Sequence, residues 1–337
     1  MSVKAVILGL SGPAISDEER QFFSKENPLG FILFARNCQS PEQIKALTSD
    51  LRACVGRADA PILIDQEGGR VARLKPPHFR KALPAGIFAA LAVKNIDLAE
   101  QAVILNSRLM AHELRELGIT VDCAPVADLL FDGAHSIIGD RSFGADVAQV
   151  VRLAGAMCRG LIDGGIVPII KHIPGHGRAK VDSHEKLPVV SNSKAELDQT
   201  DFAVFKGLAT APWAMTAHII YSAIDPDAPA TLSPKVIEMI RNDLDYSGII
   251  ISDDLSMHAL SGDFSSRTRD ALAAGCDLVL HCNGKMEEMS AVVAATLPVS
   301  PATQAKLQQS YAINHHAPLA LAADSEARLQ QMIDGGA

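Results

Sequence analysis

The chain has 337 residues, of which 48% are hydrophobic and 21% are charged. This apolar content is enough to build a sizeable core and excludes an intrinsically disordered chain. The formal net charge is −8 and no run of Lys and Arg stands out, so we expect neither a nucleic-acid partner nor an anionic membrane surface as a partner.

The first predicted element is the short apolar run Lys4–Leu8, which we interpret as a strand. A secretory signal needs a longer apolar region followed by a small-residue cleavage site. No apolar stretch approaches the roughly 18 residues of a membrane-spanning helix. The six cysteines include no CxxC pair, which favours reduced thiols over a disulfide framework or a zinc ribbon. We therefore expect a cytoplasmic protein that does not contact a membrane.

Seven further apolar runs follow, and most are almost continuous Val, Ile, Leu and Ala. Unbroken runs of this kind are typical of strands buried on both faces of a parallel sheet. The eight predicted strands are Lys4–Leu8, Gly30–Phe34, Pro61–Ile64, Thr120–Ala124, Val167–Ile170, Trp213–Thr216, Gly248–Ile251 and Asp277–Leu280.

Helical patterns separate these strands. The clearest predicted helices are Ala46–Arg57, Val103–Leu117, Val147–Ile162 and Ala195–Leu208. Capping boxes beginning at Ser16, Ser40 and Ser193 mark helix starts, and Ser-Pro pairs place Pro41, Pro234 and Pro301 at the first helical position.

Eight strands alternating with helices predict a single-domain (β/α)8 barrel that comprises residues 1–337. A doubly wound sheet is the alternative, but no GxGxxG motif follows the first run. The long connection between the third and fourth runs holds a Pro-rich stretch, Lys75–Pro84, which we expect to form an insertion at the rim of the barrel.

Chemistry in (β/α)8 barrels takes place at the C-terminal ends of the strands. Charged or imidazole side chains follow five of the eight runs. These segments are Asp65–Arg73 after the third run, Asp128 and Gly139–Gly144 after the fourth, Lys171–Gly177 and Asp182–His184 after the fifth, His218 after the sixth, and Ser252–Met257 after the seventh. Five polar strand ends on one side of a barrel indicate a functional site there.

The loop after the fifth run contains two histidines, His172 and His176. Its glycines and Pro174 preclude a helix, so these histidines cannot be the i, i+4 pair of a helical zinc site. A metal-dependent barrel hydrolase remains an alternative, but the first run is not followed by the HxH of such enzymes, and Lys171 places a cation beside His172. We expect no metal and no other cofactor, and the role of His176 stays open.

Two pairs of residues in these loops suit acid/base and nucleophilic chemistry. Asp182 and His184 are two residues apart, so on an extended loop they point the same way and the carboxylate can hold the imidazole. An oriented histidine titrates close to neutral pH, which suits a general acid/base. Asp253 and Asp254 are adjacent at a strand end, so their side chains diverge and we expect one to face the mouth of the barrel, as a nucleophile or a metal ligand.

The remaining charged residues suit a small ligand with many hydroxyl groups. Arg73, Arg141 and Lys171 supply cationic donors, and Asp65 supplies an acceptor.

Six segments together resemble glycoside hydrolase family 3, and most closely its single-domain bacterial branch, the cytoplasmic β-N-acetylhexosaminidases of cell-wall recycling. The segments are Ile64–Val71, Ala124–Val126, Gly139–Gly144, Lys171–Gly177, Asp182–His184 and Ser252–Met257. The sequence KHIPGHG followed by DSH is the most specific of them. Ile173 stands where the family pattern has Phe. This difference replaces one apolar residue by another and does not change a residue that takes part in the reaction.

The resemblance implies a role for each candidate residue. Asp253 would be the nucleophile that forms a glycosyl-enzyme intermediate, and His184 would be the general acid/base, oriented by Asp182. The residues that would hold the N-acetylglucosamine (GlcNAc) unit are Asp65, Arg73, Arg141, Lys171 and His172.

The implied activity is retaining removal of terminal GlcNAc from GlcNAc-β-1,4-(1,6-anhydro)-N-acetylmuramic acid, with or without its peptide. The implied partner is therefore a small soluble disaccharide or muropeptide. A β-glucosidase of the same family is the alternative among enzymes, and a sugar-binding barrel without activity is the alternative outside them. Nothing in the sequence points to a particular oligomeric state.

Overall fold

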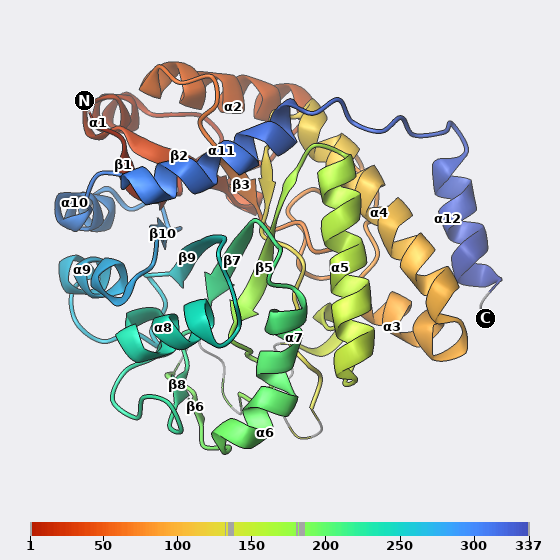
Figure 1. Ribbon diagram of the computed structural model, residues 1–337. Helices are drawn as coiled ribbons and strands as arrows, with labels where there is room; N and C mark the ends of the chain where they lie inside the picture. The colour runs from red at the N-terminus through yellow and green to blue at the C-terminus, as the bar shows by residue number, and fades with distance from the viewer. Residues whose placement is uncertain (1, 132, 134–137, 180, 182–185, 336–337) are drawn as a thin grey trace.

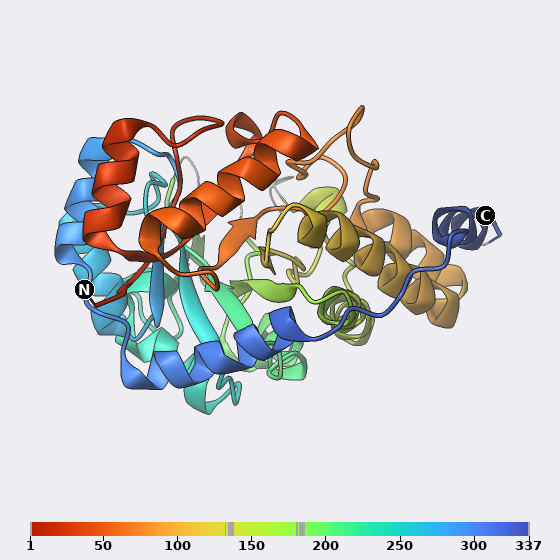
Figure 2. The ribbon, with the colours of Figure 1, turned by 90° about the horizontal axis from the view of Figure 1, so that it is seen from above.

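The computed structural model describes residues 2–131, 133, 138–179, 181 and 186–335. Within these ranges eight parallel strands form a closed barrel with helices around it, as Figures 1 and 2 show from two directions. The strand order around the barrel is β1-β10-β9-β7-β5-β4-β3-β2. The prediction of a (β/α)8 barrel is confirmed.

Each predicted apolar run overlaps one strand of the barrel. The barrel strands are β1 (Lys4–Leu8), β2 (Pro28–Leu33), β3 (Ile62–Ile64), β4 (Val121–Asp122), β5 (Val167–Ile173), β7 (Trp213–Thr216), β9 (Ile249–Asp254) and β10 (Leu278–His281). Two further strands, β6 (Val189–Val190) and β8 (Ile220–Tyr221), pair with each other in a separate small sheet. The sequence analysis did not predict these two short strands.

The helices alternate with the strands around the barrel (Figure 1). They are α1 (Asp17–Glu26), α2 (Pro41–Val55), α3 (Ala85–Lys94), α4 (Ile96–Glu116), α5 (Val147–Asp163), α6 (Lys194–Gln199), α7 (Asp201–Gly207), α8 (Pro234–Asn242), α9 (Phe264–Ala274), α10 (Met286–Ala295), α11 (Pro301–His315) and α12 (Ser325–Asp334). Short 3-10 turns lie at Ala35–Asn37, Gly139–Arg141 and Ala230–Leu232. In the part of the chain that the structure describes, none of the helices is both long and apolar enough to cross a lipid bilayer.

Alternate residues of most barrel strands belong to two different buried clusters. In β1, Ile7 belongs to the cluster that fills the barrel, whereas Val6 and Leu8 belong to the cluster between the strands and the helices. Side chains alternate between the two faces of a strand, and here both faces are buried. This double burial explains why the runs are almost continuously apolar.

Helix α11 covers the N-terminal end of the barrel. The indole Nε1 of Trp213, in β7, donates to Ser310 Oγ at 2.7 Å. Asn314 Nδ2 donates to the carbonyl oxygens of Thr120 and Gly165, at 2.9 and 3.0 Å. Figure 2 shows the helix crossing beneath the strands. The opposite, C-terminal end of the barrel is therefore the end available for a ligand.

The predicted helix starts are confirmed in position, but only one of the three capping boxes is complete. The Ser16 side chain accepts the N–H of Glu19, whose carboxylate accepts the N–H of Ser16 in return. Ser40 and Ser193 also accept the N–H three residues on. In these two helices, however, the side chain three residues on bonds to other groups.

The prediction of a single helix over Ala195–Leu208 is wrong. The helix is interrupted at Thr200, whose φ and ψ of −125° and −99° lie outside the helical range. Arg178 bridges the break, because its Nε lies 2.7 Å from Asp201 Oδ2 and its Nη2 lies 3.0 Å from Thr200 Oγ1. The interruption turns the buried carboxylate of Asp201 toward this guanidinium.

The Pro-rich stretch Lys75–Pro84 lies between α4 and the turn that follows β3. Its Arg80 binds α4 through Asn106 Oδ1, at 2.9 Å, and its Ala82 carbonyl accepts the N–H of Gly69, also at 2.9 Å. The stretch therefore stands at the rim of the barrel, as the sequence predicts.

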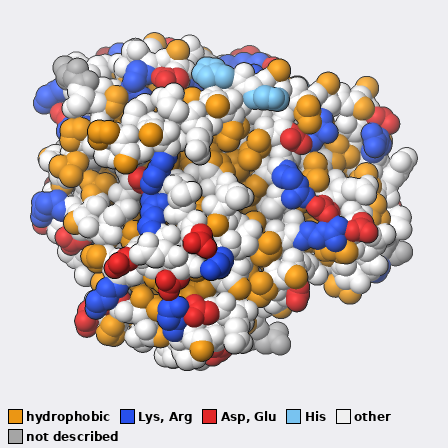
Figure 3. Space-filling view, in the orientation of Figure 1, with side chains coloured by type: hydrophobic (Ala, Val, Ile, Leu, Met, Phe, Trp, Pro, Cys, Tyr) orange, Lys and Arg blue, Asp and Glu red, His pale blue; other side chains and the backbone are white. Residues whose placement is uncertain are grey.

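The described residues on the face shown in Figure 3 mix acidic, basic and apolar side chains, and neither sign of charge covers a large area. A basic patch or stripe is the usual footprint of a nucleic-acid site, and this face does not present one.

Candidate active site

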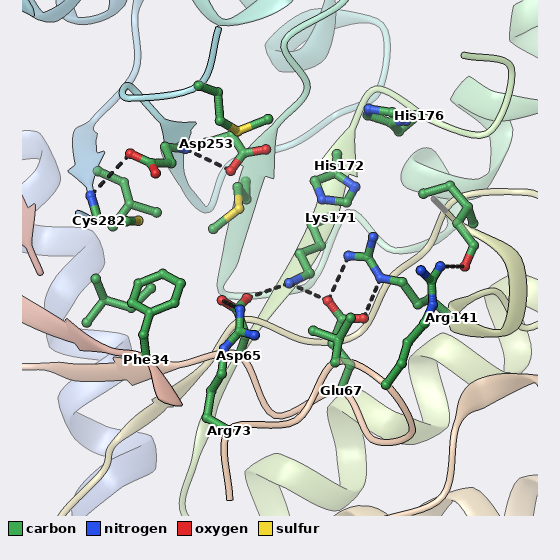
Figure 4. A pocket seen from close by; sticks show the side chains of 18 residues that line it. Phe34, Asp65, Glu67, Arg73, Arg141, Lys171, His172, His176, Asp253 and Cys282 are labelled. Carbon is green, nitrogen blue, oxygen red and sulfur yellow. Dashed lines mark hydrogen bonds and ion pairs between the residues drawn. The ribbon is translucent and has the colours of Figure 1, made fainter. Parts of the chain in front are cut away.

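A cavity of about 270 Å³ opens at the C-terminal end of the barrel (Figure 4). Of the described residues that line it, ten are charged or imidazole side chains: Asp65, Glu67, Arg70, Arg73, Arg141, Lys171, His172, His176, Asp253 and Asp254. The others are Ile32, Phe34, Val71, Ile138, Met215, Met257, Leu280 and Cys282. Six of the eight residues predicted as site residues lie here together.

A network of ion pairs forms one side of the cavity. Lys171 Nζ lies 2.8 Å from Asp65 Oδ1 and 2.7 Å from Glu67 Oε1. Arg73 binds the other oxygen of Asp65, at 2.9 Å. Arg141 binds Glu67 with two nitrogens, at 2.7 and 2.8 Å. Figure 4 shows Lys171 between the two carboxylates, with Arg73 on Asp65 and Arg141 on Glu67. We call these five residues the charged floor.

Burial and charge pairing act in opposite directions on the charged floor. Burial alone would raise the pKa of Glu67, but Lys171 and Arg141 outweigh it and lower that pKa to about 2. Burial likewise opposes ionisation of Asp65, yet Lys171 and Arg73 hold its pKa well below the usual range. Burial would lower the pKa of Lys171, but the two carboxylates raise it instead. Asp65, Glu67 and Lys171 are therefore ionised at neutral pH.

His172 and His176 lie next to the charged floor and share one carboxylate. Asp128, which is fully buried, accepts the backbone N–H of both histidines and also contacts His172 Nδ1 at 2.7 Å. Burial and the neighbouring His172 lower the pKa of His176 to about 4, so His176 is neutral at physiological pH.

Asp253 and Asp254 both line the cavity, so the expectation that one of them faces the mouth of the barrel is wrong. Asp254 is held by the N–H of Ser256 at 2.9 Å and by the N–H of Cys282 at 3.1 Å. Asp253 Oδ1 accepts the N–H of Asp254 at 2.7 Å. Asp253 is drawn on the side of the cavity toward His172 (Figure 4), whereas both hydrogen bonds of Asp254 given above join it to backbone at the ends of β9 and β10. Asp253 is therefore the better placed of the two to meet a ligand.

Two predicted site residues, Asp182 and His184, lie outside the described residues. The chain just before them is held at several points. Gly175 N–H donates to His172 O at 2.7 Å, Tyr221 donates to Gly175 O at 2.5 Å, and Arg178 pairs with Asp201. No three His, Cys, Asp or Glu side chains are grouped to hold a metal ion in the part of the chain that the structure describes.

The expectation that His218 belongs to the site is wrong. His218 is fully buried and does not line the cavity. Its Nδ1 lies 2.7 Å from Thr231 Oγ1 and its Nε2 lies 3.0 Å from the carbonyl oxygen of Asp254. The His218 ring therefore has a structural role, because it is hydrogen-bonded to the backbone at the end of β9.

Comparison with known proteins agrees with this geometry. The family model described as "Glycosyl hydrolase family 3 N terminal domain" matches residues 2–312. The chain belongs to glycoside hydrolase family 3. A "Beta-hexosaminidase" of Alkalilimnicola ehrlichii is 41% identical over 290 residues, which cover 84% of this chain and 82% of that one. A "Beta-hexosaminidase" of Pseudomonas aeruginosa is 36% identical over 340 residues and covers 98% of this chain and 99% of its own.

Solved structures of the family superpose over the whole chain. NagZ from Neisseria gonorrhoeae, described in complex with N-trifluoroacetyl-D-glucosamine, is 30% identical with a TM-score of 0.88. The match covers 100% of this chain and 99% of that one. A family 3 β-N-acetylglucosaminidase from Paenibacillus is 29% identical with a TM-score of 0.85, over 98% of this chain and 67% of its own. This member of family 3 is accordingly a glycoside hydrolase of the β-N-acetylhexosaminidase type.

Glu67, which lines the cavity, and Asp128, which lies behind it, were not predicted as site residues. Glu67 lies two positions after Asp65, and the alternation of side chains on an extended segment would have placed it on the same side. Asp128 was noted after the fourth run but was given no role. Its contact with His172 depends on how the loop after β4 folds against β5, where Ala127 N–H donates to Lys171 O at 2.7 Å. No local pattern signals that contact.

Proposed function

We propose that this enzyme removes terminal GlcNAc from GlcNAc-β-1,4-(1,6-anhydro)-N-acetylmuramic acid and its peptide derivatives, in the cytoplasm, during the recycling of peptidoglycan. The observation that carries the proposal is the charged floor beside Asp253 in a cavity of about 270 Å³. Sites for drug-sized ligands usually measure roughly 300–1,000 Å³, so this cavity suits one sugar unit with the rest of the substrate outside.

The charged floor supports recognition of a neutral sugar. Its three cations supply many N–H donors in fixed positions, and its two carboxylates supply acceptors. Hydroxyl groups both donate and accept, so a sugar with several hydroxyls can use both kinds of group. A site built in this way rejects analogues that lack a hydroxyl, because buried polar groups would then be left unpaired.

The proposed mechanism retains the β configuration. Asp253 attacks the anomeric carbon and forms a glycosyl-enzyme ester, while His184 donates a proton to the oxygen of the leaving sugar. His184 then takes a proton from the incoming water, which hydrolyses the ester. Asp182 orients the His184 ring and stabilises its charged form. The cations of the charged floor outnumber its carboxylates by one, which favours an ionised Asp253 nearby.

The substrate proposal is tested by turnover of 4-nitrophenyl β-GlcNAc against 4-nitrophenyl β-glucoside, followed by digestion of purified muropeptides. We expect hydrolysis of the GlcNAc glycoside, little hydrolysis of the glucoside, and release of GlcNAc from the disaccharide with β configuration by NMR. Preference for the glucoside, or an α product, would contradict the proposal.

A further inference from the structure

The carboxylate of Asp128 makes three hydrogen bonds, and all of them join it to the Lys171–Gly177 segment. Its Oδ1 accepts the backbone N–H of His172 at 3.2 Å and that of His176 at 2.6 Å. Its Oδ2 lies 2.7 Å from His172 Nδ1. Asp128 itself is fully buried and does not line the cavity, whereas His172 does. It can therefore act on a ligand only through residues that it holds, and of these His172 is the one whose ring it contacts.

The protonation of this pair follows from its surroundings. Burial would raise the pKa of Asp128, but the backbone N–H groups of His172 and His176 that donate to its Oδ1 help to lower it, so the carboxylate is ionised at neutral pH. An ionised carboxylate can only accept, so His172 Nδ1 must carry the proton of their shared hydrogen bond. A neutral imidazole with hydrogen on Nδ1 has a lone pair on Nε2.

We propose that Asp128 is a positioning residue that fixes the tautomer of His172, so that Nε2 accepts a hydrogen bond from one hydroxyl group of the bound sugar. The two ring nitrogens point to different sides, and Nδ1 is turned to Asp128, so Nε2 is the nitrogen left for the cavity. Most of the other polar groups in the charged floor are donors. With an acceptor at this place, His172 would recognise a sugar hydroxyl group by accepting a hydrogen bond from it. The inference rests on the proposed function for the identity of the sugar.

The variant Asp128→Asn tests the tautomer because its amide has one acceptor and one donor end. The two backbone N–H groups of His172 and His176 can only donate, so they select the amide oxygen. The NH₂ group then faces His172 Nδ1, which must become an acceptor, and the ring hydrogen moves to Nε2. The cavity would receive a donor where the wild-type protein presents an acceptor.

The first measurement is the ¹⁵N NMR spectrum of protein labelled at histidine, with His172 assigned by comparison with His172→Gln. We expect the wild-type ring to carry hydrogen on Nδ1 and the Asp128→Asn ring to carry it on Nε2. Hydrogen on Nε2 in the wild-type protein would overturn the proposal, and this result needs neither a variant that folds nor any enzymatic activity.

The second measurement compares 4-nitrophenyl β-GlcNAc with its 3-deoxy, 4-deoxy and 6-deoxy analogues. An unpaired buried polar group costs about 1–3 kcal/mol, so the wild-type kcat/KM should fall roughly 10- to 100-fold for the analogue that lacks the hydroxyl read by His172. The deoxy ratio of an analogue is the kcat/KM of the parent glycoside divided by that of the analogue. In Asp128→Asn and in His172→Gln, the deoxy ratio of that one analogue should shrink to a few-fold, while the deoxy ratios of the other two analogues stay unchanged.

The matched control is Asp225→Asn, which alters another buried carboxylate outside the cavity, bound to Ser233 Oγ at 2.6 Å. We expect this variant to keep all three deoxy ratios. Equal changes of all ratios in Asp128→Asn, or the same selective change in Asp225→Asn, would overturn the proposal. If the wild-type protein does not hydrolyse the GlcNAc glycoside, the proposed function fails, while the NMR result still decides the tautomer.

Discussion

Glu67 is the acidic centre of the charged floor, and its replacement by glutamine should destabilise the fold measurably. Its side chain is 5% exposed and is bound by both Arg141 and Lys171. A glutamine oxygen in the place of Oε1 can still accept from Lys171 Nζ and Arg141 Nη2, but its NH₂ group then faces Arg141 Nε, which is also a donor, and the negative charge is lost. The pKa of Glu67 falls from 4.5 to about 2, and a tenfold change in proton affinity is worth about 1.4 kcal/mol. The ionised network therefore stabilises the native state by about 3 kcal/mol.

The pH dependence of this effect has a definite sign. A carboxyl group whose pKa is lowered on folding stabilises the native state above its unfolded pKa, and this stabilisation is lost as the pH falls toward the folded value. The difference in unfolding free energy between the wild-type protein and Glu67→Gln should therefore have its full value near pH 7. It should shrink between about pH 4.5 and pH 2.

Thermal unfolding by calorimetry or circular dichroism at several pH values measures this difference. With an unfolding entropy of about 2.1 cal/mol/K per residue, 3 kcal/mol corresponds to a Tm lower by about 4 °C at neutral pH. The control is Asp140→Asn, which removes an exposed carboxylate 3.0 Å from Arg70 and should change stability by less than about 0.5 kcal/mol. Equal stability of Glu67→Gln and the wild-type protein at pH 7, or a difference that persists unchanged at pH 3, would refute the reasoning.

Three further predictions concern the proposed mechanism. Asp253→Asn should abolish turnover and leave the circular dichroism spectrum unchanged, and a 5-fluoro glycoside should label the peptide at Asp253, whereas a label on Asp254 would contradict the assignment. His184→Ala should slow the natural disaccharide far more than an activated aryl glycoside, roughly by a further hundredfold to ten-thousandfold. Asp182→Ala should show the same pattern more weakly, and azide should restore the second step of the aryl reaction in His184→Ala. Activity should survive exhaustive chelation, and its loss with recovery on adding zinc would support a metal instead.

The barrel was predictable from sequence because its strands are buried on both faces. That burial forces nearly every position of a strand to be apolar, so each strand stands out as a run. The interruption at Thr200 was not predictable, because it depends on Arg178, which lies 22 residues earlier in the chain. A local helical pattern holds no information about such a distant partner.

The candidate site was predictable to the extent that it depends on strand ends. Asp65, Lys171 and Asp253 each lie at the end of a barrel strand or directly after it, so the strand assignment brings them together. Direction of a side chain is harder to derive once the strand has ended. Gln66 turns away from the cavity and accepts the N–H of Arg73 at 2.9 Å, whereas Glu67 faces the cavity. Alternation along an extended segment separates these two neighbours and places Glu67 on the side of Asp65, but it ends at Gly68 and Gly69, whose φ angles are positive.

The closure of the barrel by α11 gives this protein an intrinsic optical reporter. Trp213 is the sole tryptophan of the chain, it is fully buried, and its indole is bonded to Ser310 of α11. Its fluorescence therefore reports whether α11 is packed against the N-terminal end of the barrel. The cavity opens at the opposite end, so a sugar that enters it should leave the emission maximum unchanged. Detachment of α11 would expose the indole to water and shift the emission to the red.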